Sequence, residues 1–225
     1  MNRTIKNSFA MQIARQKDTV ATLCIICVLF FAVSGCGKDF DGDTDDDPFY
    51  DFFLYSDKGQ PYDFYYGDEG KKEILYVRKD KVIIKAESAD IAKALCDETV
   101  FSSAYDVSYY FVIATINPKK TKLGDIWKIP GVVDATYGLE YADGTFQYPS
   151  DHIFMKCKDN TPEEILDAVG LTENVVEIEL FDTFSEIYLI TLNTRLGAIL
   201  KTCRNLCESG LCEFAEPSFF REFKL

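Results

Sequence analysis

The region from His152 to Phe220 constrains the fold of this chain more than any other, because its strand and helix patterns follow one another in a restrictive order. The segment His152–Lys158 alternates apolar and polar residues, which is typical of a strand with one buried face. A helix is predicted after Thr161, because Thr161-Pro162-Glu163-Glu164 combines a capping hydroxyl, a first-turn proline and a glutamate at the third position. A second helix is predicted from apolar side chains spaced three and four residues apart, at Leu196, Ile199, Leu200, Cys203, Leu206 and Cys207.

Three further strands complete this region. Val175–Phe181 and Glu186–Leu192 lie between the two helices, and Leu211–Ala215 follows the second helix after Ser209-Gly210. The resulting order, β-α-β-β-α-β, is that of the split-βαβ or ferredoxin-like arrangement. We therefore expect an α+β protein with a ferredoxin-like module in its C-terminal half.

The N-terminus has the features of a targeting segment. Four basic residues, Arg3, Lys6, Arg15 and Lys17, precede the apolar run Val20–Val33, which is short for a membrane span of roughly 20 residues. The run ends in Val33-Ser34-Gly35-Cys36, which resembles the lipobox of bacterial lipoproteins. This resemblance implies cleavage before Cys36, lipidation of Cys36, and anchoring of the chain in a bacterial outer membrane within the cell envelope. An ordinary transmembrane anchor is the alternative.

An acidic stretch, Lys38–Pro48, follows Cys36 directly. Asp39, Asp41 and Asp43 stand at alternate positions, as in an EF-hand calcium loop, but that loop requires glycine at its sixth position and glutamate at its twelfth. Those positions hold Thr44 and Tyr50, so we favour a solvated tether. The stretch resembles the tether of surface-exported lipoproteins, which implies exposure at the cell surface.

The net charge excludes one class of partner. Removal of residues 1–35 takes away four basic side chains and one acidic side chain, which changes the formal charge from −13 to −16. A chain this acidic repels a phosphate backbone, so we expect no nucleic-acid partner.

Five cysteines remain after cleavage and lipidation: Cys96, Cys157, Cys203, Cys207 and Cys212. Cys203 and Cys207 lie on the predicted apolar stripe, where a free cysteine behaves as a small hydrophobic residue. We expect both to be buried and metal-free. A disulfide and a zinc site involving Cys212 are the alternatives.

Residues 49–148 precede the ferredoxin-like region and are predicted to form a related α+β module. Strand, helix, glycine and outgoing strand recur in the same order in both halves, from Phe111 to Ala135 and from Ile187 to Ala215. The aromatic-rich stretch Phe49–Tyr66 favours an edge strand folded onto the core, and a carbohydrate-stacking surface is the alternative. We therefore expect a signal peptide at 1–35, a tether at 36–48, a first module at 49–148 and a second module at 149–225.

Catalytic motifs are not evident. The single histidine, His152, stands at the head of a strand, and no serine lies in a Gly-x-Ser-x-Gly turn. No phosphate-binding loop or dinucleotide fingerprint occurs either, so we expect no cofactor. Glu177 and Glu179 share one strand face, for which we favour a solvated surface; a paired acid site is the alternative. We expect a protein that is not an enzyme.

The segment Gly210–Phe220 looks like the last strand of the pro-regions of subtilisin-like serine proteases, through its Glu213-Phe214-Ala215-Glu216-Pro217 motif. The resemblance is closest to the long pro-regions of surface-exported lipoprotein proteases, and its pattern extends over most of residues 73–220. In that family an Asp-His-Ser catalytic domain follows. The printed chain ends at Leu225 without one, so we expect no peptide cleavage.

The resemblance implies two partner-binding surfaces. In the family the sheet of the pro-region packs on the protease, and its C-terminal tail lies in the active-site cleft. The corresponding sheet face carries Phe154, Lys156, Glu177, Glu179 and Glu213, and the tail Ser218–Leu225 carries Phe219, Phe220, Phe223 and Leu225. The expected function is that of a stand-alone inhibitor or folding chaperone of a subtilisin-like protease. The alternatives are a surface lipoprotein that uses the same fold to bind a glycan, peptide or envelope protein, and a truncated protease remnant.

Overall fold

Two long strands, β3 (Lys72–Ala86) and β7 (Phe146–Cys157), each begin a unit with the element order β-α-β-β-α-β. The computed structural model describes residues 53–67, 70–108 and 110–221, all of which belong to the same compact body. The signal segment, Cys36 and the acidic tether lie outside the described residues. No described helix is long and apolar enough to cross a membrane.

The first unit runs from β3 to the end of β6. Its strands pair in the order β4-β5-β3-β6, and every pairing is antiparallel. The elements after β3 are α2 (Ala89–Leu95), β4 (Ser103–Ser108), β5 (Phe111–Thr115), α3 (Leu123–Ile126) and β6 (Val132–Glu140).

The second unit runs from β7 to the end of β10. Its strands pair in the order β8-β9-β7-β10, again with antiparallel neighbours throughout. Two short 3₁₀ turns, Thr172–Asn174 and Leu196–Ala198, precede β8 and α5. The elements after β7 are α4 (Pro162–Ala168), β8 (Val175–Asp182), β9 (Ile187–Leu192), α5 (Ile199–Glu208) and β10 (Cys212–Arg221).

The two units share the details of their pairing as well as their order. In the first unit, Lys85 pairs with Asp134 and the next pair is Ala86 with Val132, which leaves Val133 as an extra residue. In the second unit, Lys156 pairs with Phe214 and the next pair is Cys157 with Cys212, which leaves Glu213 as the extra residue. A β-bulge therefore occupies the same position in both halves.

The first and second units, called the first and second halves from here on, are joined into a single sheet of ten strands within the described residues. A hairpin pairs the end of β6 with the start of β7, and β2 (Pro61–Tyr66) extends the sheet beyond the first part of β3. The short strand β1 (Leu54–Tyr55) pairs with β2. The predicted α+β class is confirmed, with this large antiparallel sheet and four α-helices in the described part of the chain.

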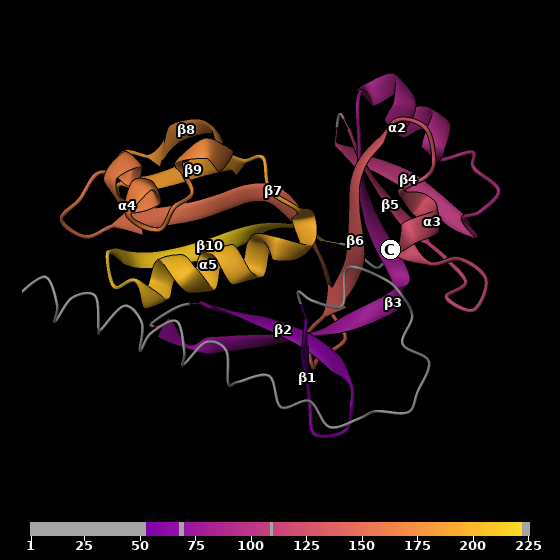
Figure 1. Cartoon of the computed structure of the whole chain (residues 1–225), viewed down its shortest axis with the longest axis horizontal. Helices are drawn as coiled ribbons and strands as arrows, with labels where there is room; N and C mark the ends of the chain where they lie inside the picture. The colour runs from indigo at the N-terminus through magenta and orange to yellow at the C-terminus, as the bar shows by residue number, and fades with distance from the viewer. Residues whose placement is uncertain (1–52, 68–69, 109, 222–225) are drawn as a thin grey trace, which may run out of the picture. The chain divides into compact units, whose positions relative to one another are not determined.

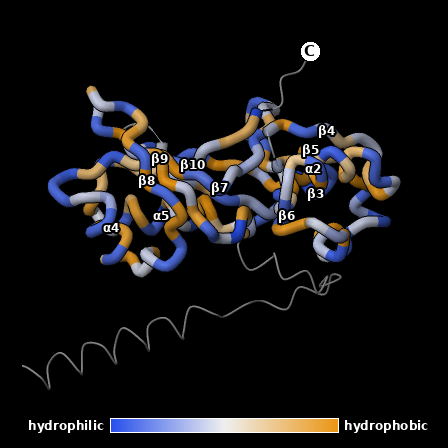
Figure 2. Tube along the Cα trace, turned by 90° about the horizontal axis from the view of Figure 1, so that it is seen from above, coloured by the Kyte–Doolittle hydropathy of each residue, from blue (hydrophilic) through white to orange (hydrophobic). Residues whose placement is uncertain are grey.

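The core lies between the sheet and the helices. Figure 1 shows α5 between β10 and β2, so this helix packs on strands from both ends of the chain. Figure 2 shows hydrophobic and hydrophilic positions alternating along the strands, as expected for strands with one buried face. The helical side chains of the second half that are buried in the hydrophobic core are Ile165, Leu166, Ile199, Leu200, Cys203 and Leu206.

The start of α4 agrees with the sequence prediction, whereas α5 begins only at Ile199, after the 3₁₀ turn that holds Leu196, and has no side-chain cap. The Thr161 hydroxyl accepts a hydrogen bond from the Glu164 amide at 3.3 Å, and the Glu164 carboxylate accepts one from the Thr161 amide at 3.0 Å. This is the reciprocal capping box that the sequence predicts. Ser88 caps α2 by accepting a hydrogen bond from the Ile91 amide at 3.3 Å.

A buried ion pair connects β2 to α5. The Arg204 guanidinium on α5 donates hydrogen bonds to the Asp63 carboxylate and, at 2.7 Å, to the backbone oxygen of Phe64. The same guanidinium lies 4.5 Å from the centre of the Phe64 ring. Burial raises the pKa of Asp63, and the positive charge of Arg204 opposes that shift.

Three predicted strand boundaries are wrong. The polar run Arg78-Lys79-Asp80 favours a turn by its sequence, yet it lies inside β3, where the Arg78 guanidinium donates hydrogen bonds to Asp80 of the same strand and to Glu140 of the neighbouring β6. The sequence pattern also favours a short strand over Thr145–Tyr148, separate from the predicted strand His152–Lys158, but a single strand, β7, covers both. The last strand does not end at Ala215 but continues to Arg221. In β3 and β7 the polar residues lie where the neighbouring strands change, whereas β10 continues along β7 through an irregularity between Pro217 and Phe219.

Candidate functional site

The outer face of the second half is the surface on which the predicted sheet-face residues lie. Ile153 and Met155 of β7 point to the core, so Phe154 and Lys156 point the opposite way. Phe154 pairs with Leu189 of β9, which in turn pairs with Glu179 of β8. The predicted positions on β7 and β8 thus share one face, opposite to α4 and α5.

The centre of this face is apolar. The rings of Phe154 and Phe181 lie 5.1 Å apart in an edge-on arrangement, and Phe181 is 63% exposed. Ile187 and Leu189 of β9 lie beside them and are partly exposed. The sequence prediction missed these three apolar positions. A usable signal exists, because Phe181 continues the every-second-residue spacing of Glu177 and Glu179 on β8, and Ile187 and Leu189 have the same spacing on β9.

Charged groups surround the apolar centre. The Lys156 ammonium lies 2.7 Å from the Glu213 carboxylate, and both side chains are substantially exposed. An exposed ion pair of this kind contributes about 0–1 kcal/mol to stability, so its charges remain available to a partner. Glu177 and Glu179 on β8 are exposed, and β8 is an edge strand of the sheet. Predicted residues Phe154, Lys156, Glu177, Glu179 and Glu213 are therefore brought together on one surface.

The equivalent face of the first half is covered. Matching the pairings of the two halves makes Ile83 equivalent to Phe154, Phe111 to Ile187, and Ile113 to Leu189. Ile83, Phe111 and Ile113 are at most 1% exposed, and they form a cluster with Tyr148 and Leu196 from the second half. The apolar side chains that are buried in the first half therefore have partly exposed equivalents in the second half.

A glycine permits part of this covering. A Cβ on Gly138 of β6 would come within 2.9 Å of the Tyr148 ring and within 2.9 Å of the Lys81 Cβ. Tyr148 is completely buried at this position. The close approach between β6 and Tyr148 therefore requires glycine.

Part of the predicted tail is integrated into the sheet. Phe219 pairs with Pro149 and its ring lies 5.8 Å from that of Tyr65, while Phe220 pairs with Tyr148 and its ring lies 5.0 Å from that of Phe111. The sequence treats the segment from Ser218 as a tail beyond the core, but β10 continues to Arg221, and the rings of Phe219 and Phe220 pack on Tyr65 and Phe111. Phe223 and Leu225 lie outside the described residues.

The histidine belongs to a charged cluster between the halves. Asp151 is 1% exposed, and its carboxylate lies 2.5 Å from Lys85 Nζ and 2.7 Å from His152 Nδ1. Burial raises the pKa of Asp151, but the hydrogen bonds from His152 and Lys85 outweigh that effect and lower it. The nearby Ser150 hydroxyl donates to the Ser218 backbone oxygen at 3.0 Å. That serine is engaged with the backbone, so the cluster has the form of an ion-pair network.

The cysteines divide into two environments. Cys203 is fully buried, as predicted, and burial raises its pKa well above the ordinary value. Cys207 is partly exposed, so its predicted burial is wrong: it sits on the last turn of α5, where the helix leaves the core. All five described cysteines are free thiols, and no group of three or more His, Cys, Asp or Glu side chains in the described residues is arranged to hold a metal ion.

The described part of the aromatic stretch forms β1 and β2 rather than the single edge strand predicted, and of the two only the two-residue β1 lies at the edge of the sheet. Phe53 and Tyr65 are buried, and the centre of the Phe64 ring lies 3.6 Å from the Lys72 ammonium and 4.5 Å from the Arg204 guanidinium. Tyr55 of β1 is 49% exposed, so the stretch contributes both to the core and to the surface.

The open sheet face of the second half is thus the candidate functional site, defined by geometry and by its internal counterpart. No protein-family model, no curated protein and no solved structure matches this chain.

Proposed function

We propose that this chain is a non-catalytic binding protein, whose second half is a ferredoxin-like module that docks its outer sheet face on a subtilisin-like protease and inhibits it or assists its folding. The choice of target rests on the resemblance of Gly210–Phe220 to the pro-regions of those proteases. The strand order β8-β9-β7-β10, with both helices on one face, supports a ferredoxin-like reading of the second half. The order β4-β5-β3-β6 supports the same reading of the first half.

The observation that carries the proposal is the difference between two equivalent faces of the same chain. Ile83, Phe111 and Ile113 are buried, whereas Phe154 and Leu189 are partly exposed. Apolar positions left open in a sheet face mark an interaction site when they are contiguous and bordered by polar groups. The second half meets both conditions.

The charges around this face define the partner. Exposed carboxylates on Glu177, Glu179 and Glu213 favour a partner with an apolar patch bordered by cationic side chains or helix N-termini. A second copy of this acidic chain would bring like charges together, so self-association through this face is disfavoured. Lipidation at Cys36 would hold the chain in the outer membrane, where an exported protease is within reach.

Inhibition of purified subtilisin by the purified chain tests the proposal. Leu189→Asp and Phe181→Asp should each weaken inhibition at least tenfold, because a carboxylate is placed in the apolar centre of the face. Ile74→Asp is the matched control, since Ile74 is a comparably exposed apolar residue on β3 of the first half, 40% exposed. It should leave inhibition unchanged, and circular dichroism melting should show that all three variants remain folded.

The outcomes separate the target from the surface. A chain that neither inhibits subtilisin nor speeds its refolding would contradict the proposed target. If Leu189→Asp and Phe181→Asp inhibited as strongly as the unsubstituted chain, the proposed surface would be contradicted.

A further inference from the structure

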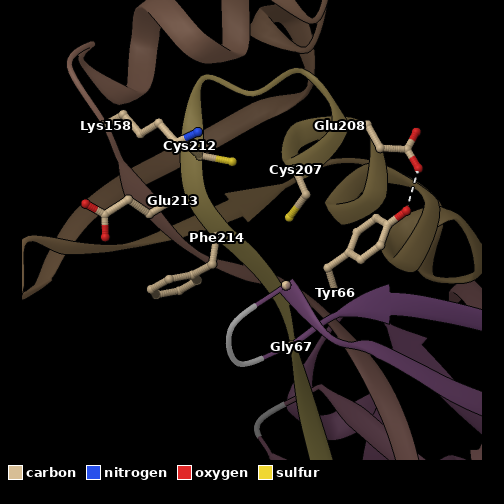
Figure 3. Close-up of a pocket in the computed structure, with 9 residues that line it drawn as sticks. Tyr66, Gly67, Lys158, Cys207, Glu208, Cys212, Glu213 and Phe214 are labelled. Carbon is tan, nitrogen blue, oxygen red and sulfur yellow. Dashed lines mark hydrogen bonds between the residues drawn. The ribbon is translucent and has the colours of Figure 1, made fainter.

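The end of α5 and the start of β10 bring two cysteines to the wall of one open pocket. Cys207 lies on the last turn of α5, and Cys212 is the first residue of β10. The pocket has a volume of about 240 Å³, and Figure 3 shows both sulfur atoms in its lining. Its other lining residues are Tyr66, Gly67, Gly70, Lys158, Glu208, Glu213 and Phe214.

Backbone groups fix the two sulfur atoms. The Ala215 amide donates a hydrogen bond to Cys207 Sγ at 3.2 Å, and the Cys212 thiol lies 3.1 Å from the Leu206 backbone oxygen. The Cys212 thiol donates its proton to that oxygen, and the side chains of Cys207 and Cys212 also interact with each other. The Cys207 sulfur is therefore an acceptor of a backbone hydrogen bond, whereas the Cys212 thiol is a donor to the backbone.

This asymmetry assigns different chemistry to the two thiols. The interaction with Cys212 and the hydrogen bond from the Ala215 amide lower the pKa of Cys207 to about 7, against burial and the negative charges of Glu216 and Glu208. The same interaction with Cys207, together with burial, raises the pKa of Cys212. Because the thiolate is the nucleophilic form, Cys207 is the attacking group and Cys212 stays protonated until a second step.

We propose that Cys207 and Cys212 form a thiol–disulfide exchange site for small, soluble disulfides. The Cys207 thiolate attacks one sulfur of the external disulfide, the S–S bond breaks, and one small thiolate leaves with the bonding electron pair. The Cys212 thiol then gives up its proton, and its sulfur attacks the Cys207 sulfur and displaces the second small thiolate. The two protein thiols are oxidised to a Cys207–Cys212 disulfide, and the external disulfide is reduced to two thiols.

The remaining cysteines do not fit this role. Cys203 lies one helical turn before Cys207 but is fully buried, so an external disulfide cannot reach it. Cys96 and Cys157 are partly exposed, as Cys207 is, yet burial raises the pKa of each. These two therefore serve as internal controls of similar accessibility and lower reactivity.

Tryptic mapping of the full-length chain tests the proposal directly. Reduced protein is treated with glutathione disulfide at pH 7, quenched with acid and N-ethylmaleimide, and digested with trypsin. Cleavage after Arg204 and Arg221 places Cys207 and Cys212, and no other cysteine, in the peptide Asn205–Arg221. This peptide should lose two hydrogens and carry no maleimide, while Cys96 and Cys157 should be recovered with maleimide attached.

Two variants separate the roles of the thiols. Cys212→Ser should accumulate glutathione on Cys207, because the second thiol needed to release it is gone. Cys207→Ser should leave Cys212 unmodified by glutathione. The proposal would be overturned if the peptide from the unsubstituted chain carried maleimide on both cysteines, or if Cys207 were found linked to a cysteine outside it.

The test does not depend on the proposed protease target. Its readout is covalent and local, so loss of protease inhibition would leave it unaffected, and its failure would leave the sheet face unaffected.

Discussion

At the residue scale, the buried pair of Asp63 and Arg204 is a contact at which a single substitution should have a large effect. Arg204→Met keeps much of the side-chain volume but leaves the Asp63 carboxylate buried without its guanidinium. Breaking a buried pair in this way typically costs about 3–5 kcal/mol of unfolding free energy. We expect a loss of that order, measured by urea unfolding.

The double variant Asp63→Asn, Arg204→Met provides the control. It removes both charges, so it should recover part of the stability lost by Arg204→Met alone. A loss below about 1 kcal/mol for Arg204→Met would show that water, rather than the guanidinium, satisfies Asp63.

Asp151 gives a second residue-scale prediction, in this case for pH. Its pKa is lowered in the folded state from the ordinary 3.8, so its ionised form stabilises the fold above pH 3.8. That contribution should be lost as pH falls from about 3.8 through the lowered folded pKa. Urea unfolding from pH 5 down to pH 3 should show the stability advantage of the unsubstituted chain over Asp151→Asn shrinking. A difference that stays constant would contradict the lowered pKa.

At this scale, hydrogen bonds between residues close in sequence could be predicted. The solvent exposure of a side chain, which depends on residues far away in the sequence, could not. The capping roles of Thr161 and Ser88 follow from side chains and amides within three residues of one another. The exposure of Cys207 depends on where α5 leaves the core, which the helical spacing of its apolar residues does not reveal. The openness of Phe181 and Leu189 likewise depends on what the rest of the chain covers.

At the element scale, the last four described residues of β10 pack on side chains from the first part of the chain. A chain ending at Pro217 loses the packing of Phe219 on Tyr65 and of Phe220 on Phe111. Because each aromatic side chain removed from a core costs roughly 3–5 kcal/mol when fully buried, we expect these half-buried rings together to contribute roughly 3 kcal/mol or more.

The comparison should be made with a chain ending at Arg221, which keeps all of β10. Thermal unfolding should show a markedly lower midpoint for the shorter chain. Equal midpoints would mean that Phe219 and Phe220 add little to the fold and are free to serve the tail-binding role that the resemblance implies.

Strand lengths were the least predictable elements. Period-2 alternation locates a strand face, but it fails where both faces are buried or where the pairing partner changes. Ser150 and Asp151 read as a polar break, yet both are buried inside β7, since that strand passes between the two halves. Strand β4 was missed because no residue of Ser103–Ser108 is buried and the strand lies at an edge of the sheet.

At the scale of the whole molecule, the recurrence of element order was the most informative feature of the sequence. It predicts two halves in which a strand, a helix, a glycine and a final strand follow one another in the same order. In the structure, the pairing of β3 with β6 and that of β7 with β10 have a β-bulge at the same position. The sequence could not show that one half covers the other, because the residues that do so, Tyr148, Leu196 and Phe220, are ordinary apolar residues in it.

The contact between β2 and α5 also determines when the molecule can finish folding. Asp63 and Arg204 are 141 residues apart in the chain, and loop closure over such a separation is entropically costly and slow. During synthesis, β2 therefore has no helix to pack on until α5 has left the ribosome, 141 residues after Asp63. Over that interval the side of β2 that faces α5 in the folded protein stays without its packing partner.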